Sequence, residues 1–318
     1  MSGRTDIYVP ALDAAAARRW AVGIACGLLA GALWGLVFVA PRMLPGVPSV
    51  DLTAGRFVSY GAMAALVMLL GLRTRRLPNG REALAALGLS VLGFTGYYLL
   101  LVLAVRDAGT EMPALIIGTI PVWVMLMGKP QGLRWAALLP GLVLTVAGLA
   151  LMAGGRSGAP SVDGAHWGRG IALSVAALAC WTAFAVLNAA WLRRNPQVSA
   201  TDWANWLGVA TGVGGLLLWS VAGSAPAQLS ALLQGPLGVG FVVLALALGI
   251  GSSWLATILW NIASQRLSAS LCGQLIVSET LFALVYSFLW DGQWPTLAQA
   301  AAALLFTLGI LASIKAHR

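Results

Sequence analysis

The stretch ILWNIASQRLSASLCGQLIVSETLFALVYSFLW, residues 258–290, decides how this chain folds. From Leu271 to Trp290 it is an apolar run, and about 20 such residues in a helix cross the roughly 30 Å hydrocarbon core of a bilayer. One carboxylate, that of Glu279, lies about half way along the run. A charged carboxylate near the bilayer centre is costly unless it is protonated, paired or facing water. Glu279 is therefore the first candidate for a functional residue.

The composition of the whole chain is that of a membrane protein. Of its 318 residues 59% are hydrophobic and only 9% are charged, with a mean hydropathy of +0.87, whereas a soluble domain has about a quarter of its residues charged. The apolar runs are continuous rather than alternating, which predicts helices and not barrel strands. We expect an all-α integral membrane protein with ten transmembrane helices. Their expected spans are 20–40, 52–72, 84–105, 110–128, 133–153, 168–190, 201–222, 237–259, 269–289 and 296–315.

The positive charges are unevenly divided between the two sides of this layout. With a cytoplasmic N-terminus, fourteen of the 19 Lys and Arg residues fall in inside segments. The outside segments hold Arg42, Arg106, Arg156 and Arg169, and Arg56 lies within the second helix. An excess of Lys and Arg is typical of cytoplasmic loops. We therefore expect a multi-pass protein of the bacterial inner membrane with both termini in the cytoplasm, and we interpret the net charge of +9 as a topology signal rather than as nucleic-acid binding.

The chain repeats itself. GIACGLLAGALWG from Gly23 and GIALSVAALACWT from Gly170 share Gly-Ile-Ala and a later Trp, at residues 34 and 181. Two halves of five helices follow, and because five is odd the second half enters the membrane from the opposite side. Inverted repeats around one shared site are a recurring plan of secondary transporters. The expected parts are a cytoplasmic N-terminal segment 1–19, a first repeat 20–153, a periplasmic linker 154–167, a second repeat 168–315 and a cytoplasmic tail 316–318.

Three consecutive segments of the second half carry a family resemblance. They are WLATILWNIASQRLSAS, then QLIVSETLFALVYSFL, then AAALLFTLGILAS. In this order they resemble the EamA-type members of the drug/metabolite transporter superfamily, and the resemblance covers nearly all ten expected helices. Thr280 stands where the family usually has Pro, although Pro121 keeps the corresponding residue in the first repeat. A kink is therefore expected in the fourth helix and is in question in the ninth.

Within that superfamily the layout is most similar to amino-acid exporters, including the aromatic amino-acid exporters of the YddG type. The resemblance implies export of small metabolites, above all amino acids with aromatic or bulky apolar side chains, by alternating access through a central cavity. Exporters of other drugs or metabolites are the alternative within the same superfamily. The expected partners are a small-molecule substrate and the lipid bilayer, with no nucleic acid, and a monomer is compatible with the sequence.

The role of Glu279 has two interpretations. It could face a cavity, where it would bind a substrate ammonium or take up a proton. Alternatively it could hydrogen-bond to its surroundings and lock the packing, because Gln274, Ser278 and Thr280 are close enough in sequence to satisfy a carboxylate.

Deep aromatic and amide side chains are further candidates for a substrate cavity. Many of the 14 Trp residues lie at expected helix ends, where indoles anchor in the headgroup region. The deeper rings could stack on flat or apolar substrates, although packing against lipid or another helix is the commoner role. Buried amides mark either a cavity wall or an interhelical hydrogen bond. The candidates are Trp34, Tyr97, Tyr98, Trp123, Trp181, Asn188, Trp254 and Asn261.

Three charged residues are candidates for gates or ion pairs. Arg56 is expected to extend outward and pair with Asp51, and the alternative is a guanidinium that reaches a substrate carboxylate. Glu111, near the expected outer face, could be offset by Arg106 or by the positive end of its own helix. A gate or a local ion pair is the favoured interpretation of that site.

Proline and glycine mark two more features. Pro113 and Pro121 cannot donate helical hydrogen bonds, which predicts a bend in the fourth helix. Gly27, Gly31 and Gly35 form a small-residue stripe on the first helix. Such a stripe permits close contact with another helix, and it could serve packing, sliding or dimerisation.

The sequence also excludes competing classes of protein. No GxxxxGK[ST] phosphate loop is present, so ATP is not the expected driver. No HExxH or GxSxG motif occurs, and two His and three dispersed Cys residues favour neither an enzyme, nor a metal site, nor a cofactor. Rings of charge and filter loops typical of channels are absent. An intramembrane enzyme and a channel are therefore the disfavoured alternatives to a carrier.

Overall fold

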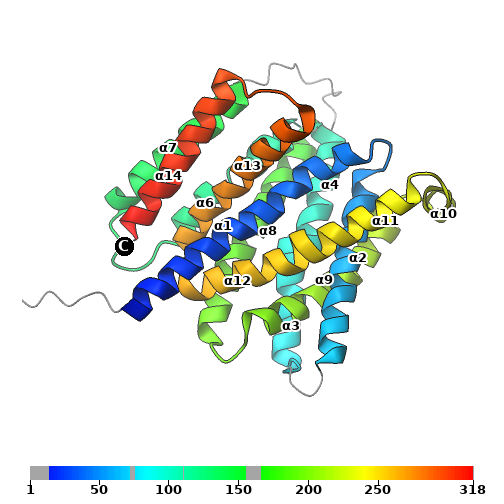
Figure 1. Ribbon diagram of the computed structural model, residues 1–318, viewed down its shortest axis with the longest axis horizontal. Helices are drawn as coiled ribbons and strands as arrows, with labels where there is room; N and C mark the ends of the chain where they lie inside the picture. Colours follow the sequence, from blue (N-terminus) through cyan, green and yellow to red (C-terminus); the bar gives the residue numbers. More distant parts are fainter. Residues whose placement is uncertain (1–13, 72–75, 110, 155–165, 318) are drawn as a thin grey trace, which may run out of the picture.

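The computed structural model describes residues 14–71, 76–109, 111–154 and 166–317 (Figure 1). Within these ranges all regular structure is helical. Nine helices of the described chain are long and apolar enough to cross a membrane, and Met112–Met127 adds a shorter apolar segment. An all-α multi-pass membrane protein is thus confirmed. Most of the expected N-terminal segment 1–19 and of the linker 154–167 lies outside the described residues, as does Arg318.

The first half contains five of these apolar segments. The first helix is longer than expected and begins within the segment assigned to the N-terminal tail. The third contains a π-helical stretch, and the fourth is broken into two short helices. The elements are α1 (Ala14–Met43), α2 (Ser49–Leu70), α3 (Gly80–Ser90), η1 (Val91–Thr95), α4 (Gly96–Ala108), α5 (Glu111–Gly118), α6 (Ile120–Met127) and α7 (Trp135–Gly154).

The second half follows a similar plan. Its third long segment also contains a π-helical stretch, and one short helix, α10, was not expected from the sequence. The elements are α8 (Trp167–Arg194), α9 (Ala200–Ala222), α10 (Pro226–Gln234), α11 (Gly238–Ala247), η2 (Leu248–Leu255), α12 (Ala256–Arg266), α13 (Ala269–Asp291) and α14 (Leu297–Ala316).

Local capping residues start several of these helices. Asn79 accepts a hydrogen bond from the Glu82 N–H while the Glu82 carboxylate accepts one from the Asn79 N–H, which forms a capping box at α3. Ser199, Ser268 and Thr296 cap α9, α13 and α14 through their side-chain oxygens. Each cap satisfies N–H groups that the first turn of a helix leaves without partners.

Proline explains why the fourth and ninth segments differ. α5 ends at Gly118 and α6 begins at Ile120, with Thr119 between them and Pro121 in the first turn of α6. The Thr119 hydroxyl donates to the Ile116 carbonyl, 2.6 Å away, and so satisfies an acceptor at the break. By contrast α13 runs unbroken from Ala269 to Asp291, because Thr280 keeps its backbone N–H. The expected bend in the fourth helix is present, and the ninth helix is continuous.

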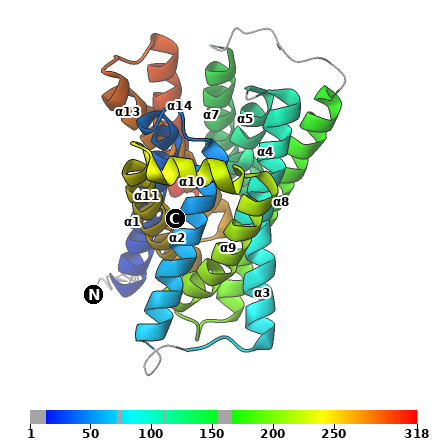
Figure 2. The ribbon, with the colours of Figure 1, turned by 90° about the vertical axis from the view of Figure 1, so that its right-hand side faces the viewer.

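Helix packing joins the two halves across long sequence separations. α2 packs on α9, α7 on α14, α1 on α12 and α13, and α4 on α8. Figure 1 shows α7 beside α14, and Figure 2 shows α2 and α9 on the face turned toward the viewer. The first helix of each half makes corresponding contacts with the other half. α1 packs on α12 and α13, which are the end of the third segment and the fourth segment of the second half. α8 packs in the same way on α4 and on α5 and α6 of the first half. The contacts therefore follow a two-fold pattern.

The direction of the paired helices can be read from close contacts. Gly61 of α2 lies opposite Gly212 of α9, whereas Phe57, one turn earlier, lies opposite Gly215. α2 and α9 therefore run antiparallel. The same holds for α7 and α14, which meet where Gly148 faces Phe306 and, further toward the end of α14, where residue 141 faces residue 313.

The glycine stripe of α1 is used within the chain. A Cβ at Gly27 would lie 2.6 Å from the Leu275 side chain, and one at Gly35 would lie 2.9 Å from the Ala283 backbone. Gly31 between them faces Ser278. Of the three alternatives left open by the sequence, close packing against α13 describes this stripe.

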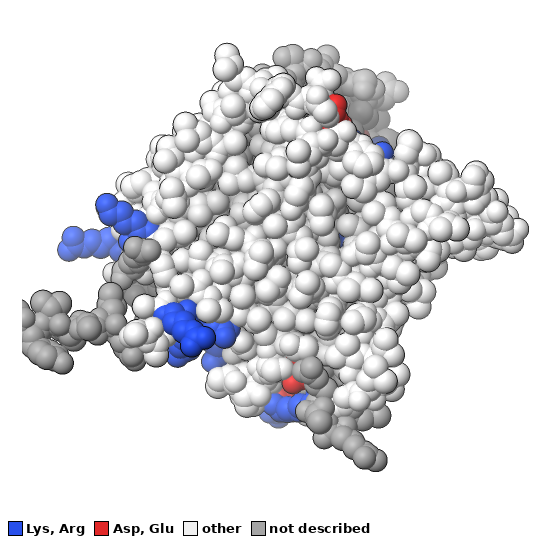
Figure 3. Space-filling view, in the orientation of Figure 1, with Lys and Arg blue, Asp and Glu red and all other residues white. Residues whose placement is uncertain are grey.

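The charges gather at one end of the bundle. Figure 3 shows Lys and Arg along the lower and lower-left edge of this face, while the opposite end carries few charges of either sign. α1 begins and α14 ends at the basic end, because Trp20 and His317 line the same pocket there. The described ends of the chain therefore lie together at the basic end, as the charge pattern predicts for a cytoplasmic face.

Replacement of Gly61 by Ala should destabilise the protein, because the new Cβ would lie 2.5 Å from the Gly212 backbone. We expect Gly61→Ala to lower the free energy of unfolding by about 1–3 kcal/mol through overpacking. Gly88→Ala is the matched control, since a Cβ there meets nothing within 4 Å and should be neutral or stabilising by up to about 1 kcal/mol. Thermal unfolding in detergent measures both, and equal stability of the two variants would contradict the close approach.

Candidate substrate site

Three tryptophans from three helices meet in the interior. Trp34 of α1 lies 6.3 Å from Trp181 of α8 and 5.4 Å from Trp260 of α12, measured between ring centroids. Trp181 and Trp260 are 6.4 Å apart. Trp34 and Trp181 are the two tryptophans that follow the similar Gly-Ile-Ala segments of the sequence at the same spacing, and their rings are in contact. Trp260 is buried, whereas Trp34 and Trp181 are half-buried.

The aromatic cluster continues from Trp181 toward α2 and α4. The ring of Phe184 lies 6.0 Å from Trp181 and 5.5 Å from Phe94, which lies in η1. Phe94 contacts Phe57 at 6.1 Å, and Phe57 in turn contacts Tyr98 at 6.1 Å. Most of these pairs are edge-to-face, the arrangement that aromatic quadrupoles favour. One wall of rings therefore extends from α1 to α4.

The guanidinium of Arg56 lies at the end of this wall. Its Cζ atom is 4.8 Å from the centroid of the Phe57 ring, a cation–π contact. Its Nε atom is buried and has no hydrogen-bond partner in the described chain. The expected pair with Asp51 does not form, because the Asp51 carboxylate accepts hydrogen bonds from the Ser224 N–H and hydroxyl. The outward orientation predicted for Arg56 is therefore wrong, and the alternative interpretation of a guanidinium available to a ligand remains.

Glu279 lies near the middle of α13 and is half-buried. Its charge interacts electrostatically with Arg56 and Tyr97, but no direct ion pair joins it to either residue among the described contacts. The neighbours that could have satisfied it have other partners: Gln274 donates to the Thr145 hydroxyl and Ser278 to the Leu275 carbonyl. No hydrogen bond joins the third neighbour, Thr280, to the carboxylate either, so Glu279 has no hydrogen bond in the described chain and the contacts that the packing interpretation requires are not formed.

Asn188 and Asn261 belong to an interhelical network. The Asn188 amide donates to the Asn261 carbonyl oxygen over 3.1 Å and accepts from the Trp203 indole N–H over 2.7 Å. Asn261 donates in turn to the backbone carbonyl of Ala200 at 3.3 Å. Both asparagines are fully buried. Of the two interpretations of these asparagines, the interhelical hydrogen bond fits the structure and the cavity wall does not.

Two further tryptophan candidates lie in different surroundings. Trp254, in η2, is half-buried and donates its indole N–H to the Asn205 side chain over 2.8 Å. Trp123 is 47% exposed, and its neighbours Val124 and Met125 are buried. The Trp123 ring therefore has no contact with the aromatic wall among the ring pairs of the described residues.

The end of the bundle opposite the described chain ends contains ion pairs other than the expected one. The Glu111 side chain lies outside the described residues, and Arg106 is exposed with no salt bridge in the described chain. The acidic partner at this position is Asp107, which accepts two hydrogen bonds from Arg169. Arg42 pairs with Asp291 over 2.7 Å. Both pairs join a helix of the first half to one of the second, which sequence spacing alone did not indicate.

Several residues of the aromatic wall were not identified from the sequence. Phe57, Phe94, Phe184 and Trp260 are ordinary apolar residues of long hydrophobic runs, and no local motif separates them from lipid-facing residues. The π-helical segment Val91–Thr95 and its counterpart Leu248–Leu255 were also missed. Such segments occur frequently at functional sites. Their equivalent places in the two halves are a signal visible only in the structure.

Comparisons with known proteins agree with this architecture. The EamA-like transporter family matches residues 21–154. Inner membrane protein YtfF of Escherichia coli (strain K12) is 34% identical over 306 residues, which covers 92% of this chain and 95% of YtfF. A protein of known crystal structure superposes with a TM-score of 0.73 at 22% identity and covers 92% of this chain and 96% of its own. That last likeness concerns the fold alone.

Fold and relatives together define a multi-pass inner-membrane transporter of small molecules. The chain belongs to the EamA-like transporter family. Its family is one of transporters rather than of enzymes, in agreement with the class favoured by the sequence.

Loss of the Asn188 side chain should affect stability more than substrate binding. Asn188→Ala would leave the Trp203 indole N–H and an Asn261 oxygen buried without partners, at a cost of about 1–3 kcal/mol in unfolding free energy. Trp203→Phe removes the donor together with part of a buried ring that stacks on Trp191, so the hydrogen bond is measured by the coupling and not by this single variant. A double-mutant cycle measured by thermal unfolding should give a coupling of about 1 kcal/mol, and strictly additive effects would show that the hydrogen bond contributes nothing.

Proposed function

We propose that this protein is a secondary transporter that exports amino acids with aromatic or bulky apolar side chains. Export proceeds by alternating access of a central cavity between two inverted halves, residues 20–153 and 168–315. Arg56 and Glu279 carry opposite charges that interact electrostatically, but no direct ion pair joins them in the described chain. This pair of side chains, beside a wall of aromatic rings, is the observation that carries the proposal.

The carboxylate and the ammonium of an amino acid are the hydrogen-bond partners that Arg56 and Glu279 lack in the described chain. A carboxylate accepts hydrogen bonds from a guanidinium, and charge-assisted bonds of this kind are among the stronger ones in proteins. The buried Nε of Arg56 needs such an acceptor. The substrate ammonium would pair with the Glu279 carboxylate, which has no hydrogen-bond donor in the described chain. A zwitterion thus compensates both charges at once, whereas an anion or a cation alone would compensate one.

The aromatic wall suits the side chain of such a substrate. Trp34, Tyr97, Tyr98 and Trp181 are half-buried and lie on helices adjacent to Arg56 or Glu279. Flat rings are attracted by edge-to-face and offset contacts with such residues. We assign these four side chains to the cavity lining, with Trp254 beside them on η2. A polar substrate side chain would make no ring or apolar contacts with this wall. Aromatic and bulky apolar amino acids are therefore the favoured substrates.

Several features support an alternating-access mechanism. The antiparallel contacts of α2 with α9 and of α7 with α14 are those expected of ten spans arranged as inverted halves. The family match ends at residue 154, close to the proposed end of the first half. The basic end, with both described chain ends, is proposed to be cytoplasmic.

The ion pairs Arg42–Asp291 and Arg169–Asp107 suit the role of an outer gate. Each joins one half to the other at the end opposite the chain termini. Their separation would accompany opening toward the outside. The Arg42–Asp291 pair is partly exposed on both sides and is therefore weak enough to break, whereas Asp107 is buried and accepts two hydrogen bonds from Arg169.

Loss of the Arg56 guanidinium should weaken substrate binding. In counterflow, proteoliposomes are loaded with an unlabelled amino acid and the uptake of the labelled one is measured. We expect Arg56→Gln to reduce the apparent affinity for phenylalanine or tryptophan at least about tenfold, because a buried charged contact is lost. Arg194→Gln, at an exposed position near the basic end, is the matched control and should behave as wild type. Exchange confined to compounds that are not amino acids would remove the substrate assignment.

Glu279 is proposed to couple export to the proton gradient. Wild-type protein should then accumulate substrate against its gradient when a pH difference is imposed, because a carboxylate that alternately binds a proton and an ammonium links the two fluxes. Glu279→Gln should retain at most counterflow and lose gradient-driven accumulation. A Glu279→Gln variant with the pH dependence of the wild type would exclude the proton role.

A further inference from the structure

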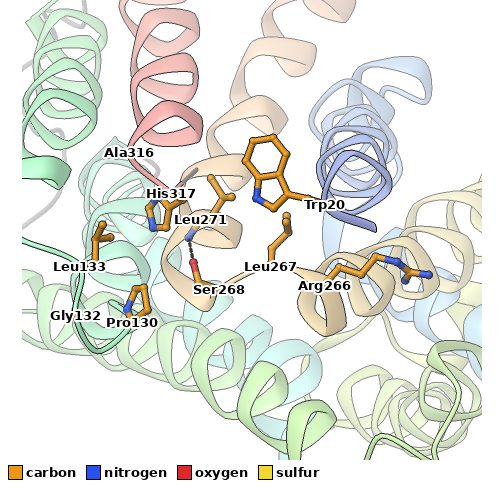
Figure 4. A pocket seen from close by; sticks show the side chains of 10 residues that line it. All are labelled: Trp20, Pro130, Gly132, Leu133, Arg266, Leu267, Ser268, Leu271, Ala316 and His317. Atoms are coloured by element: carbon orange, nitrogen blue, oxygen red, sulfur yellow. Dashed lines mark hydrogen bonds between the residues drawn. The ribbon is translucent and has the colours of Figure 1, made fainter. Parts of the chain in front are cut away.

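A pocket lies at the basic end of the bundle, and none of the residues that line it belongs to the aromatic wall. Its volume is about 460 Å³, and it is lined by four segments that are distant in sequence (Figure 4). Trp20 comes from α1, Leu133 from the loop before α7, Leu271 from the first turn of α13, and His317 from the end of α14. The proposed substrate site does not use any of these residues.

The charge around this pocket has one sign. The lining segments and their immediate neighbours, residues 18–20, 129–134, 266–271 and 315–317, contain six Lys and Arg residues and no Asp or Glu. Arg266 is exposed and lies at the rim, where its guanidinium extends outward in Figure 4 and donates to the Ile262 carbonyl. α13, which is 23 residues long, begins at this pocket with its N-cap Ser268 and directs the positive end of its dipole there.

The imidazole of His317 provides a buried polar atom at the pocket. Its Nδ1 atom is 2.7 Å from the Ser313 carbonyl, which can only accept, so Nδ1 is the donor. The remaining nitrogen, Nε2, is buried and has no hydrogen-bond partner in the described chain. Burial lowers the pKa of the His317 imidazole, and in the neutral ring Nε2 is an acceptor. The negative charge of a bound headgroup would favour the protonated ring, in which Nε2 donates to the anion. Figure 4 places this ring on the wall of the pocket opposite Leu267 and Arg266.

The rest of the lining is apolar. Trp20, Leu267 and Leu271 lie near one another on one side of the pocket, and Leu133 lies on the other side, beside His317 (Figure 4). Together they form an apolar lining at the end of the membrane-spanning helices, the level at which headgroups lie. A soluble metabolite anion would use the charges but not this lining. A phospholipid with an anionic headgroup would use both, and basic pockets between helices on the cytoplasmic side are a known setting for such lipids.

We propose that this pocket binds the phosphate-containing headgroup of an anionic phospholipid, with the acyl chains along the apolar lining. Trp20 and Leu133 belong to the first half of the chain, and Leu267 and Leu271 to the second. A bound headgroup therefore joins the two halves at the basic end and stabilises the conformation in which these segments are together. The site is occupied independently of transport.

The proposal is tested by thermal unfolding of purified protein in detergent with added lipid. Phosphatidylglycerol should raise the midpoint of wild-type protein with a saturable dependence on concentration, and phosphatidylcholine at equal concentration should not. In the double variant Arg266→Gln/His317→Gln the apparent affinity should fall at least about tenfold, whereas the matched control Arg194→Gln should retain it. Leu133→Trp, which fills the pocket without removing a charge, should also abolish the shift.

Three outcomes would overturn the assignment. Equal stabilisation by inorganic phosphate alone would identify a small-anion site instead of a lipid site. Equal stabilisation by phosphatidylcholine would reduce the effect to general lipid solvation. An unchanged shift in both the double variant and Leu133→Trp would place the lipid elsewhere. None of these readouts requires transport, so failure of the amino-acid assignment would leave this test unaffected.

Discussion

The close approach of α2 to α9 is the contact on which the arrangement of the two halves depends. At Gly61 and Gly212 the two backbones touch with no side chain between them. In lipid, where apolar surface gains little from being transferred between helix and membrane, such close van der Waals contact between small residues is a main source of helix association. Because this contact crosses from one half to the other, it sets where the remaining pairs, α1 with α13 and α4 with α8, can meet.

Polar groups in the interior fall into two kinds. Asn188, Asn261 and Trp203 satisfy one another across helices, as buried polar groups in a rigid framework must. Arg56 and Glu279 do not: each retains polar atoms without a protein hydrogen bond in the described chain. Other buried polar atoms of the described chain also lack a protein partner, among them the Trp260 indole N–H, but Arg56 and Glu279 are the two charged side chains of this kind beside the aromatic wall. Such a division is what a transporter needs, since a ligand that completes the site must also be able to leave it.

Local features were predictable from the sequence, and long-range partners were not. Hydropathy identified the spans, and Pro121 identified the break in the fourth helix, because both act within a few residues. The partner of Asp51 is Ser224, 173 positions away, and no spacing rule points to it. The prediction for Arg56 failed for that reason. Whether Asn188 faced a cavity or another helix likewise depended on helix rotation, which periodicity defines only coarsely.

The break at Thr119 has a thermodynamic consequence. Two identical inverted halves would make the inward-open and outward-open states equivalent by symmetry, with equal free energies and no built-in preference. Here the fourth helix is interrupted while its counterpart α13 is continuous. In the alternating-access mechanism proposed above, this difference would remove the equivalence of the two states, and the resting population would favour one side of the membrane before any ligand or ion gradient acts on it.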